Sequence, residues 1–231
     1  MNLLLFSAAD RIGGNRVEVR DGRLQHLREV HRAAPGDSVR VGEVGGRMGH
    51  GEIRALDAHS ATRAVTLDTP PPDKLPLGVI LALPRPQRLR RVLRAVAEFG
   101  VAELHLVNSY RVEKSYWQTP VLAPEMIRDL LLQGLAQSRD TVLPTVTCQR
   151  RFKPFAEDLL PGMTDGRRAL LAHPGDYPPC PRGTLEEMLL VIGPEGGFIP
   201  YEVEKMQAAG CQAVSLGPRI LRVENAVTSL L

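Results

Sequence analysis

The stretch LLVIGPEGGF, residues 189–198, decides the fold of this 231-residue chain. Four apolar residues run directly into a turn that contains Gly193, Gly196 and Gly197. Glycine lets the backbone approach a ligand closely and present its N–H groups, because no Cβ is in the way. In open α/β sheets, ligands bind just beyond the carboxyl ends of the strands. The stretch therefore predicts a buried strand that ends in a ligand-binding loop.

A second stretch of the same kind, SLGPRILRVENA, covers residues 215–226. A strand again ends in Gly-Pro, and two arginines then flank two aliphatic residues before Glu224 and Asn225 open a helix. Apolar side chains beside backbone donors suit an adenine ring, and the polar residues that follow suit a reacting base. Either loop alone is more often structural than functional. Two such loops after neighbouring strands predict a ligand pocket.

Strands and helices alternate around these loops. Apolar runs predict strands at 78–83, 103–107, 168–172, 189–192 and 213–216. Helices are expected before Gly100, from Pro124 to about Ser138, and from Pro200 onwards. The first helix should bury a face formed by Leu89, Val92, Leu93, Val96 and Phe99. This alternation is typical of an α/β domain with a mainly parallel sheet, which we place at residues 78–231.

The first 69 residues have a different pattern. Short alternating runs separated by glycines predict several strands, and one short helix is expected from Leu24 to Arg32. Such a pattern favours a small β-barrel domain at residues 1–69. Residues 70–77 contain four prolines, which we expect to keep this segment out of any helix or central strand. The segment is predicted to be a stiff linker between the two domains.

Composition narrows the class of protein. Hydrophobic residues make up 43% of the chain and charged residues 24%, as in soluble globular proteins, and no apolar run is long enough to span a membrane. The three cysteines are widely spaced, which argues against a disulfide framework or a metal site and favours the cytoplasm. The signatures GxGxxG, GxxxxGK[ST], HExxH and GxSxG, which mark dinucleotide, phosphate, zinc and serine-hydrolase sites, are absent.

Basic residues are concentrated in one segment. Net charge is only +3, but all except four of the 29 basic residues are arginines, and five of them fall between Pro84 and Arg94. Arginine pairs with phosphate in a two-point fashion, so the cluster suggests contact with a nucleic acid. The alternative is an ordinary solvated helix face.

At the two loops the sequence resembles the RsmE family of ribosomal RNA methyltransferases, in the SPOUT superfamily. The matching motifs are LLVIGPEGGF (189–198) and VSLGPRILRVENA (214–226). Further similar stretches extend the resemblance over nearly the whole chain: ALPR at 82–85, AEFGV at 97–101, QSR at 137–139, LAHP at 171–174, and HLxxVxR at 26–32 followed by PGD at 35–37. The chain departs from the family at Asn225 and Val223, where other residues are usual, and at Pro174, which replaces an acid.

The resemblance implies a PUA-like β-barrel that helps bind RNA, joined to a SPOUT domain with a C-terminal trefoil knot. It further implies a homodimer that uses S-adenosylmethionine to methylate N3 of a uridine in small-subunit (16S) ribosomal RNA. The implied cofactor-binding residues are Leu171, Ile192, Gly193, Gly196, Gly197, Leu216, Gly217, Ile220 and Leu221. The implied catalytic residues are Arg222, Glu224 and Asn225, and the expected RNA contacts are Arg28, Arg32, Arg85, Arg88 and Arg91.

Several other functions remain open at the level of sequence. A non-catalytic RNA-binding or ribosome-assembly factor could have kept the same fold, and a SPOUT methyltransferase could act on another RNA. An unrelated small-molecule α/β enzyme is disfavoured by the arginine cluster and by the missing nucleotide motifs. Glu224 could cap the last helix, and Glu195 could form a hydrogen bond within its own turn, without either having a catalytic role.

Overall fold

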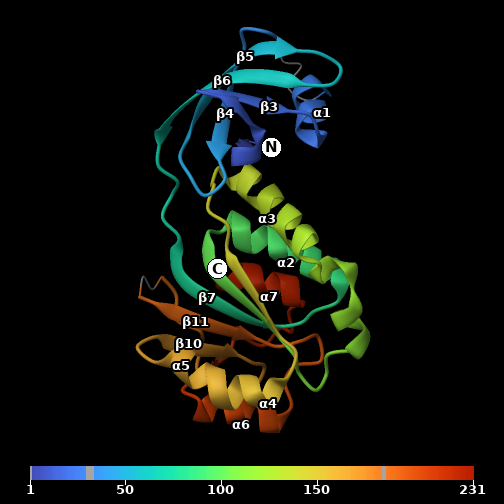
Figure 1. Cartoon of the computed structure of the whole chain (residues 1–231). Coiled ribbons are helices and arrows are strands. Elements are labelled where there is room, and N and C mark those ends of the chain that lie inside the picture. The colour runs from blue at the N-terminus through green and yellow to red at the C-terminus, as the bar shows by residue number, and fades with distance from the viewer. Residues whose placement is uncertain (1, 30–33, 184–185) are drawn as a thin grey trace. The chain divides into compact units, whose positions relative to one another are not determined.

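The computed structural model describes residues 2–29, 34–183 and 186–231. The chain divides into two compact units, which Figure 1 labels by element. The N-terminal unit combines residues 1–73 with residues 131–143, and the C-terminal unit combines residues 74–130 with residues 144–231. Each unit is built on its own six-stranded sheet.

The N-terminal unit contains one sheet with strand order β1-β4-β5-β6-β3-β2. The strands are β1 (Leu4–Phe6), β2 (Arg11–Gly13), β3 (Arg16–Val19), β4 (Ser38–Glu43), β5 (Met48–Leu56) and β6 (Ala61–Thr69). All neighbours are antiparallel except β1 and β4, which run parallel. This small β unit agrees with the expected PUA-like barrel. Helix α1 covers Gly22–Glu29, and the predicted end of that helix at Arg32 lies outside the described residues.

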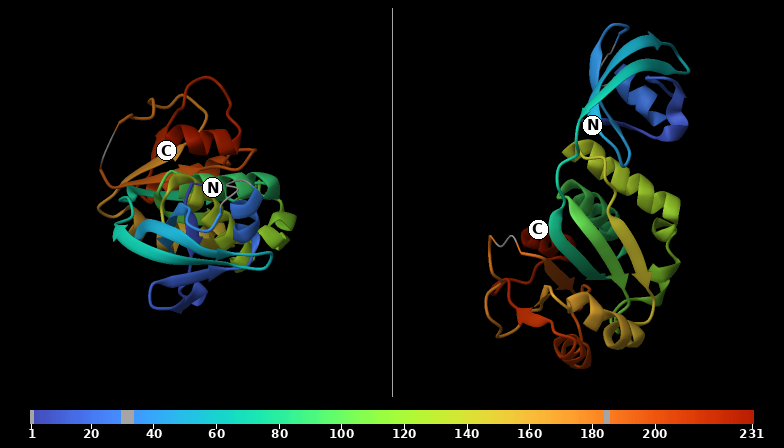
Figure 2. Two further views of the ribbon diagram at one scale, coloured as in Figure 1. Left: turned by 90° about the horizontal axis from the view of Figure 1, so that it is seen from above. Right: turned by 60° about the vertical axis from the view of Figure 1, so that its left-hand side comes forward.

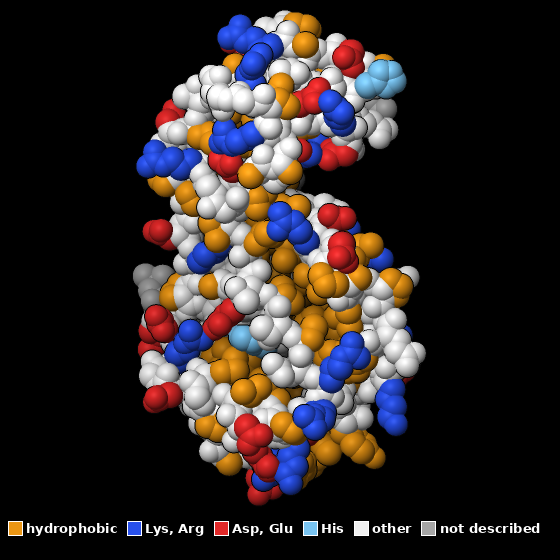
Figure 3. Space-filling view, viewed as in Figure 1, with side chains coloured by type: hydrophobic (Ala, Val, Ile, Leu, Met, Phe, Trp, Pro, Cys, Tyr) orange, Lys and Arg blue, Asp and Glu red, His pale blue; other side chains and the backbone are white. Residues whose placement is uncertain are grey.

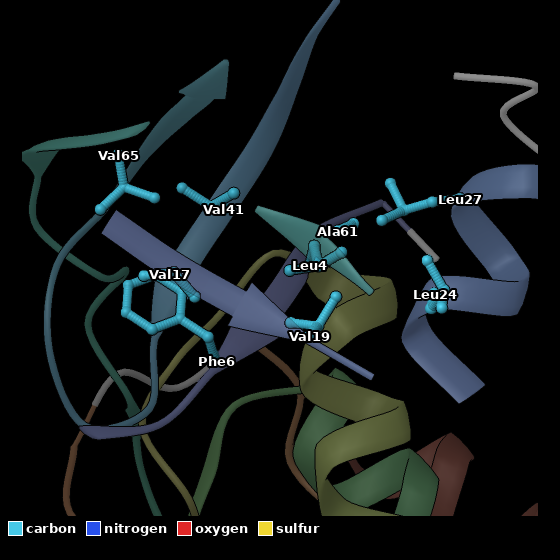
Figure 4. Close-up of a cluster of buried hydrophobic side chains, with 9 residues drawn as sticks. All are labelled: Leu4, Phe6, Val17, Val19, Leu24, Leu27, Val41, Ala61 and Val65. Atoms are coloured by element: carbon cyan, nitrogen blue, oxygen red, sulfur yellow. The ribbon is translucent and has the colours of Figure 1, made fainter. Parts of the chain in front are cut away.

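Alternating side chains of these strands form the core of the N-terminal unit. Val17 and Val19 of β3, and Ala61 and Val65 of β6, point to the same side of the sheet, as the two-residue period of a strand requires. Figure 4 shows how side chains of α1 complete this cluster. Its buried members are Leu4, Phe6, Val17, Val19, Leu24, Leu27, Val41, Ala61 and Val65.

Residues 131–143 belong to the N-terminal unit although they follow residue 130 of the other unit. The carbonyl of Ala136 accepts hydrogen bonds from the backbone N–H groups of Asn2 and Leu3, both at 2.9 Å. Gly45 donates its N–H to the carbonyl of Thr141, at 2.8 Å. The sequence patterns had placed this segment with the C-terminal domain, and the helix that contains it, α3 (Pro124–Ser138), contributes to both units.

The C-terminal unit contains a parallel sheet with strand order β12-β10-β11-β7-β8-β9. The predicted α/β class is confirmed. The strands are β7 (Leu75–Ala82), β8 (Val101–Val107), β9 (Thr145–Gln149), β10 (Arg168–Ala172), β11 (Met188–Ile192) and β12 (Gln212–Val214). The knot implied by the resemblance stays a prediction.

Helices cover the parallel sheet. Helix α2 (Pro86–Glu98) packs against β8 and against α7 (Val223–Leu230), which also contacts β11. Helix α6 (Pro200–Ala208) packs near β12, and with it lie the short helical segments α4 (Phe152–Pro154), η4 (Phe155–Leu159) and α5 (Leu160–Thr164). Figure 2 shows the arrangement from two further directions. In the face seen in Figure 3, hydrophobic side chains gather over the middle of this unit, with Lys and Arg side chains around them.

Two sequence-based expectations about this unit are wrong. Pro76 lies inside β7, a central strand, although we expected the prolines of 70–77 to exclude one. The strand tolerates it because the pairing with β8 shifts register between Leu75 and Gly78, so the missing N–H of Pro76 is not needed there. Phe99 is 42% exposed instead of buried, because it is the C-cap residue beyond the last full turn of α2.

Candidate functional site

Three parallel strands of the C-terminal unit end side by side. Ala172, the last residue of β10, pairs with Ile192 at the end of β11 and with Val214 at the end of β12. The N–H of His173 donates to the carbonyl of Val214 at 3.0 Å, so the hydrogen bonding between β10 and β12 extends one residue beyond the end of β10. The two glycine-rich loops predicted from sequence therefore leave the sheet at the same edge, where α/β proteins bind ligands.

A pocket lies at this edge, between the two loops and the first turn of α7. Most of its wall is apolar, and its polar side chains are those of His173, Glu195, Ser215 and Arg219. The lining residues are Ala172, His173, Pro174, Ile192, Gly193, Pro194, Glu195, Gly197, Ser215, Leu216, Gly217, Arg219, Ile220, Leu221, Val223 and Ala226. An apolar pocket with a few polar groups is the usual form of a small-molecule site.

Seven of the nine predicted cofactor residues line this pocket: Ile192, Gly193, Gly197, Leu216, Gly217, Ile220 and Leu221. The other two, Leu171 and Gly196, do not. Leu171 is fully buried, and its neighbour Ala172 lines the pocket in its place, because successive side chains of a strand point to opposite faces. The role of all nine in binding a cofactor stays a prediction.

Close packing fixes the loop at 193–197, which we call the glycine loop. The N–H of Gly197 donates to the carbonyl of Pro194 at 2.8 Å, which closes a tight turn. A Cβ on Gly193 would lie 3.2 Å from the ring of Phe198, and Gly197 has a φ of 71°. Glycine is favoured at both positions, at the first for space and at the second for backbone conformation.

The three predicted catalytic residues lie at the start of α7 and do not line the pocket. Arg222 is the exposed N-cap of the helix, and Asn225 is exposed as well. Glu224 is largely buried and lies 3.4 Å from Arg88 and 3.6 Å from Arg91. The residues of this turn that do line the pocket are Val223 and Ala226. Catalytic roles for Arg222, Glu224 and Asn225 remain predictions.

The predicted RNA-binding arginines have different surroundings. Arg88 is only 25% exposed and forms an ion pair with Glu195 at 3.2 Å, whereas the side chain of Arg91 is 67% exposed. Arg85, just before α2, is exposed, and its backbone N–H donates to Glu195 at 3.2 Å. Arg28 is exposed on α1, and Arg32 lies outside the described residues.

Sequence reasoning gave no catalytic or binding role to several residues of the site. Arg219 lines the pocket, and Arg111, from the loop after β8, donates to the carbonyl of Gly196. His173 also lines the pocket; burial lowers its pKa, and the nearby charge of Arg111 lowers it further. The position of His173 directly after an apolar strand was the available signal. For Arg111 we find none in the sequence, because its loop is distant from both motifs.

Among residues 2–29, 34–183 and 186–231, no group of three or more His, Cys, Asp or Glu side chains could hold a metal ion. No helix in the same ranges is long and apolar enough to cross a membrane.

Known proteins resemble the chain in sequence and in structure. A relative from Treponema pallidum, the ribosomal RNA small subunit methyltransferase E, is 28% identical over 98% of this chain and 87% of its own length. The Synechocystis protein of the same name is 27% identical over 98% of this chain and 75% of its own length. The crystal structure of the methyltransferase E from Neisseria gonorrhoeae, bound to S-adenosyl methionine, superposes with a TM-score of 0.75 at 22% identity, over 98% of this chain and 94% of that one.

The family model described as RNA methyltransferase domain matches residues 71–231, which include the whole parallel sheet and both glycine-rich loops. A probable rRNA-methyltransferase from Porphyromonas gingivalis has the same fold, with a TM-score of 0.73 at 24% identity over 97% of this chain and 93% of that one. The resemblance to RsmE proteins that the two motifs predicted is confirmed. The chain therefore belongs to the RNA methyltransferase family.

Proposed function

We propose that the pocket at the ends of β10, β11 and β12 binds S-adenosylmethionine. One observation carries this proposal. The two glycine-rich loops leave the parallel sheet side by side, within the region that matches the RNA methyltransferase family model. Ile192, Leu216 and Leu221 offer an apolar wall for an adenine ring, and the glycine loop brings backbone close to the ligand. When bound, the cofactor supplies an activated methyl group on its sulfonium.

The proposed reaction is methylation of N3 of a uridine in small-subunit (16S) ribosomal RNA. Uracil N3 carries a weakly acidic proton and is a poor nucleophile until that proton leaves. Arg222 is exposed beside the pocket wall, and a cation there would stabilise the negative charge that develops on the base. We assign the orientation of the base to Glu224 and Asn225. The base has to be unpaired or flipped out to reach such a site.

The proposed RNA contacts are the arginines Arg28, Arg32, Arg85, Arg88 and Arg91. The proposed partner is the small ribosomal subunit or its RNA, which places the reaction in the cytoplasm. We also propose a homodimer. Exposed apolar side chains at Leu216, Ile220 and Leu221 support it, since Ile220 is 77% exposed and such residues often mark an interface. Sedimentation of the purified protein as a monomer at micromolar concentration would contradict the dimer.

The proposal is tested by methyl transfer to small ribosomal subunits purified from cells that lack the gene. Tritium from labelled S-adenosylmethionine should enter the RNA, and mapping should place it on N3 of one uridine. Label in a different RNA, or at another atom, would support methyltransferase activity but contradict the proposed substrate. No incorporation, together with no cofactor binding in calorimetry at millimolar concentration, would favour a non-catalytic RNA-binding or assembly factor.

A further inference from the structure

Glu202 is a buried acid in the first turn of α6, and its side chain does not line the pocket. The residue is 2% exposed, and its carboxylate accepts three hydrogen bonds. One oxygen accepts the backbone N–H of Tyr110 at 2.7 Å. The other accepts the hydroxyl of Ser109 at 3.0 Å and the N–H of Ile199 at 3.1 Å. A buried carboxylate needs such donors, because leaving it unpaired costs several kcal/mol.

These three donors come from two segments that are far apart in sequence. Ser109 and Tyr110 lie in the loop after β8, and Ile199 lies two residues after the glycine loop. A single carboxylate therefore holds both segments. The β8 loop is also fixed on its other side, since Trp117 donates its indole N–H to the side chain of Asn108 at 2.9 Å.

The residue next to Tyr110 reaches the glycine loop itself. Arg111 donates to the carbonyl of Gly196. A Cβ on Gly196 would lie 3.0 Å from Cδ of Arg111, so the arginine stem also packs closely against this glycine. Arg111 thus contacts the glycine loop at Gly196, and its neighbour Tyr110 is held by Glu202. The same carboxylate holds Ile199, two residues beyond the loop.

We propose that Glu202 is a positioning residue for the methyl-donor pocket, acting through Arg111 and the glycine loop. It fixes the shape of the 193–197 backbone before the ligand arrives, so that ligand binding does not have to order the loop. This inference rests on the proposed function for the identity of the ligand, but not for the connection between Glu202 and the loop.

The first test measures the affinity for S-adenosylmethionine by calorimetry in Glu202→Gln. The amide keeps the size of the side chain but turns an NH₂ group towards N–H or O–H donors. We expect Kd to rise about tenfold or more, the effect of losing a hydrogen bond to a charged group. Glu204→Gln is the matched control, because Glu204 is exposed on the same helix, and its Kd should equal that of the wild type. Equal affinity in Glu202→Gln and wild type would overturn the inference.

The second test separates positioning from a general loss of stability. Arg111→Ala should weaken binding in the wild type, but should add little in the Glu202→Gln background, because the support it removes is already lost. Fully additive effects would contradict action through Arg111. If Glu202→Gln does not fold, Ser109→Ala removes one of the three bonds and should give the same pattern with a smaller rise in Kd.

A third measurement does not depend on the ligand. Hydrogen exchange of the unliganded protein should be faster at Tyr110 and Ile199 in Glu202→Gln, and also at Gly197, whose N–H bonds within the glycine loop. Unchanged protection of Gly197 would refute transmission to the loop. If the wild type fails to bind S-adenosylmethionine, the proposed function fails, whereas the exchange of Gly197 still decides whether Glu202 holds the loop.

Discussion

The guanidinium of Arg88 lies 3.2 Å from the carboxylate of Glu195, and this ion pair joins α2 to the glycine loop. The same arginine lies 3.4 Å from Glu224 at the start of α7. Arg88 therefore connects both family motifs to a helix that neither motif contains. Arg88 therefore differs from a freely exposed phosphate-binding arginine, because an incoming RNA phosphate has to compete with Glu195 and Glu224 for its guanidinium.

Replacing Arg88 by alanine should affect two measurements at once. The Kd for S-adenosylmethionine should rise about three- to tenfold, because the glycine loop loses its pairing partner, a change of roughly 1 kcal/mol. RNA binding should weaken, and the slope of its salt dependence should fall by about one. Calorimetry and RNA titrations at several salt concentrations check both effects.

Arg91→Ala is the matched control, because the Arg91 side chain is 67% exposed and contacts Glu224 only at 3.6 Å. It should reduce the salt slope without changing the cofactor affinity. An Arg88→Ala protein with normal cofactor affinity would show that the ion pair does not support the loop.

Gly217→Ala should weaken cofactor binding through backbone strain. Gly217 has a φ of 102°, and a Cβ there would meet no atom within 4 Å, so conformation and not space is the obstacle. The strain is about 1–2 kcal/mol, which corresponds to a five- to thirtyfold rise in the Kd for S-adenosylmethionine. Gly45→Ala, which has a φ of 77° and equally open surroundings in the N-terminal unit, should lower stability similarly and leave this Kd unchanged.

Gly49→Ala should destabilise the N-terminal unit strongly. A Cβ at this position of β5 would lie 1.9 Å from the carbonyl oxygen of Thr66 on the neighbouring strand, so the sheet would have to open. We expect a loss of about 3 kcal/mol or more in urea denaturation. Gly46→Ala, in the turn before the strand, would make an ordinary 3.4 Å contact with Glu43 and should change stability by less than about 0.5 kcal/mol. A small effect at Gly49 would contradict the strand register.

The Asp10–Arg23 ion pair should make stability depend on pH. Burial opposes ionisation of Asp10, but hydrogen bonds from Arg23, at 2.7 Å, and from Ser7 outweigh it, and the pKa of Asp10 lies below its usual value. Its contribution is therefore complete above about pH 4 and is lost as the pH falls through the lower, folded-state pKa. Asp10→Asn should be about 1–2 kcal/mol less stable than wild type at pH 7. The difference should shrink at pH 3; a constant difference would contradict this account.

Arg63 is a fully buried arginine whose guanidinium nitrogens have no hydrogen-bond partner among the described residues. Burial lowers its pKa to about 10, and the charge of Arg23 contributes in the same direction. Because an unpaired buried charge is unfavourable, Arg63→Met should raise the free energy of unfolding by about 1–4 kcal/mol. Arg40→Met on exposed surface should change it little. A destabilised Arg63→Met protein would show that the guanidinium has a favourable role in the core.

The sequence predicted the strands around the pocket well, because the apolar runs in β10 and β11 are followed directly by histidine and by glycine. It could not give their order in the sheet, since β12 pairs with β10 and not with its predecessor β11. It also missed β9, whose residues Thr145–Gln149 alternate only weakly at the edge of the sheet.

Within the site, the structure differs from expectation in which of two neighbours lines the pocket. Leu171 and Ala172 are adjacent in an apolar strand, and only the structure decides which side chain turns to the pocket. Glu202 looks in sequence like any acid in the first turn of a helix, where a negative charge is favourable on the surface. Its burial depends on Ser109 and Tyr110, more than ninety positions earlier in the chain.

Because residues 131–143 belong to the N-terminal unit, this unit cannot complete its folding early in translation. Asn2 and Leu3 are translated more than 130 residues before Ala136, whose carbonyl accepts hydrogen bonds from their N–H groups. The N-terminal sheet thus emerges from the ribosome without these partners, and the ribosome has to add residues 74–130 before they exist. Folding of this unit can begin during translation, but it is completed only once residue 143 has left the exit tunnel.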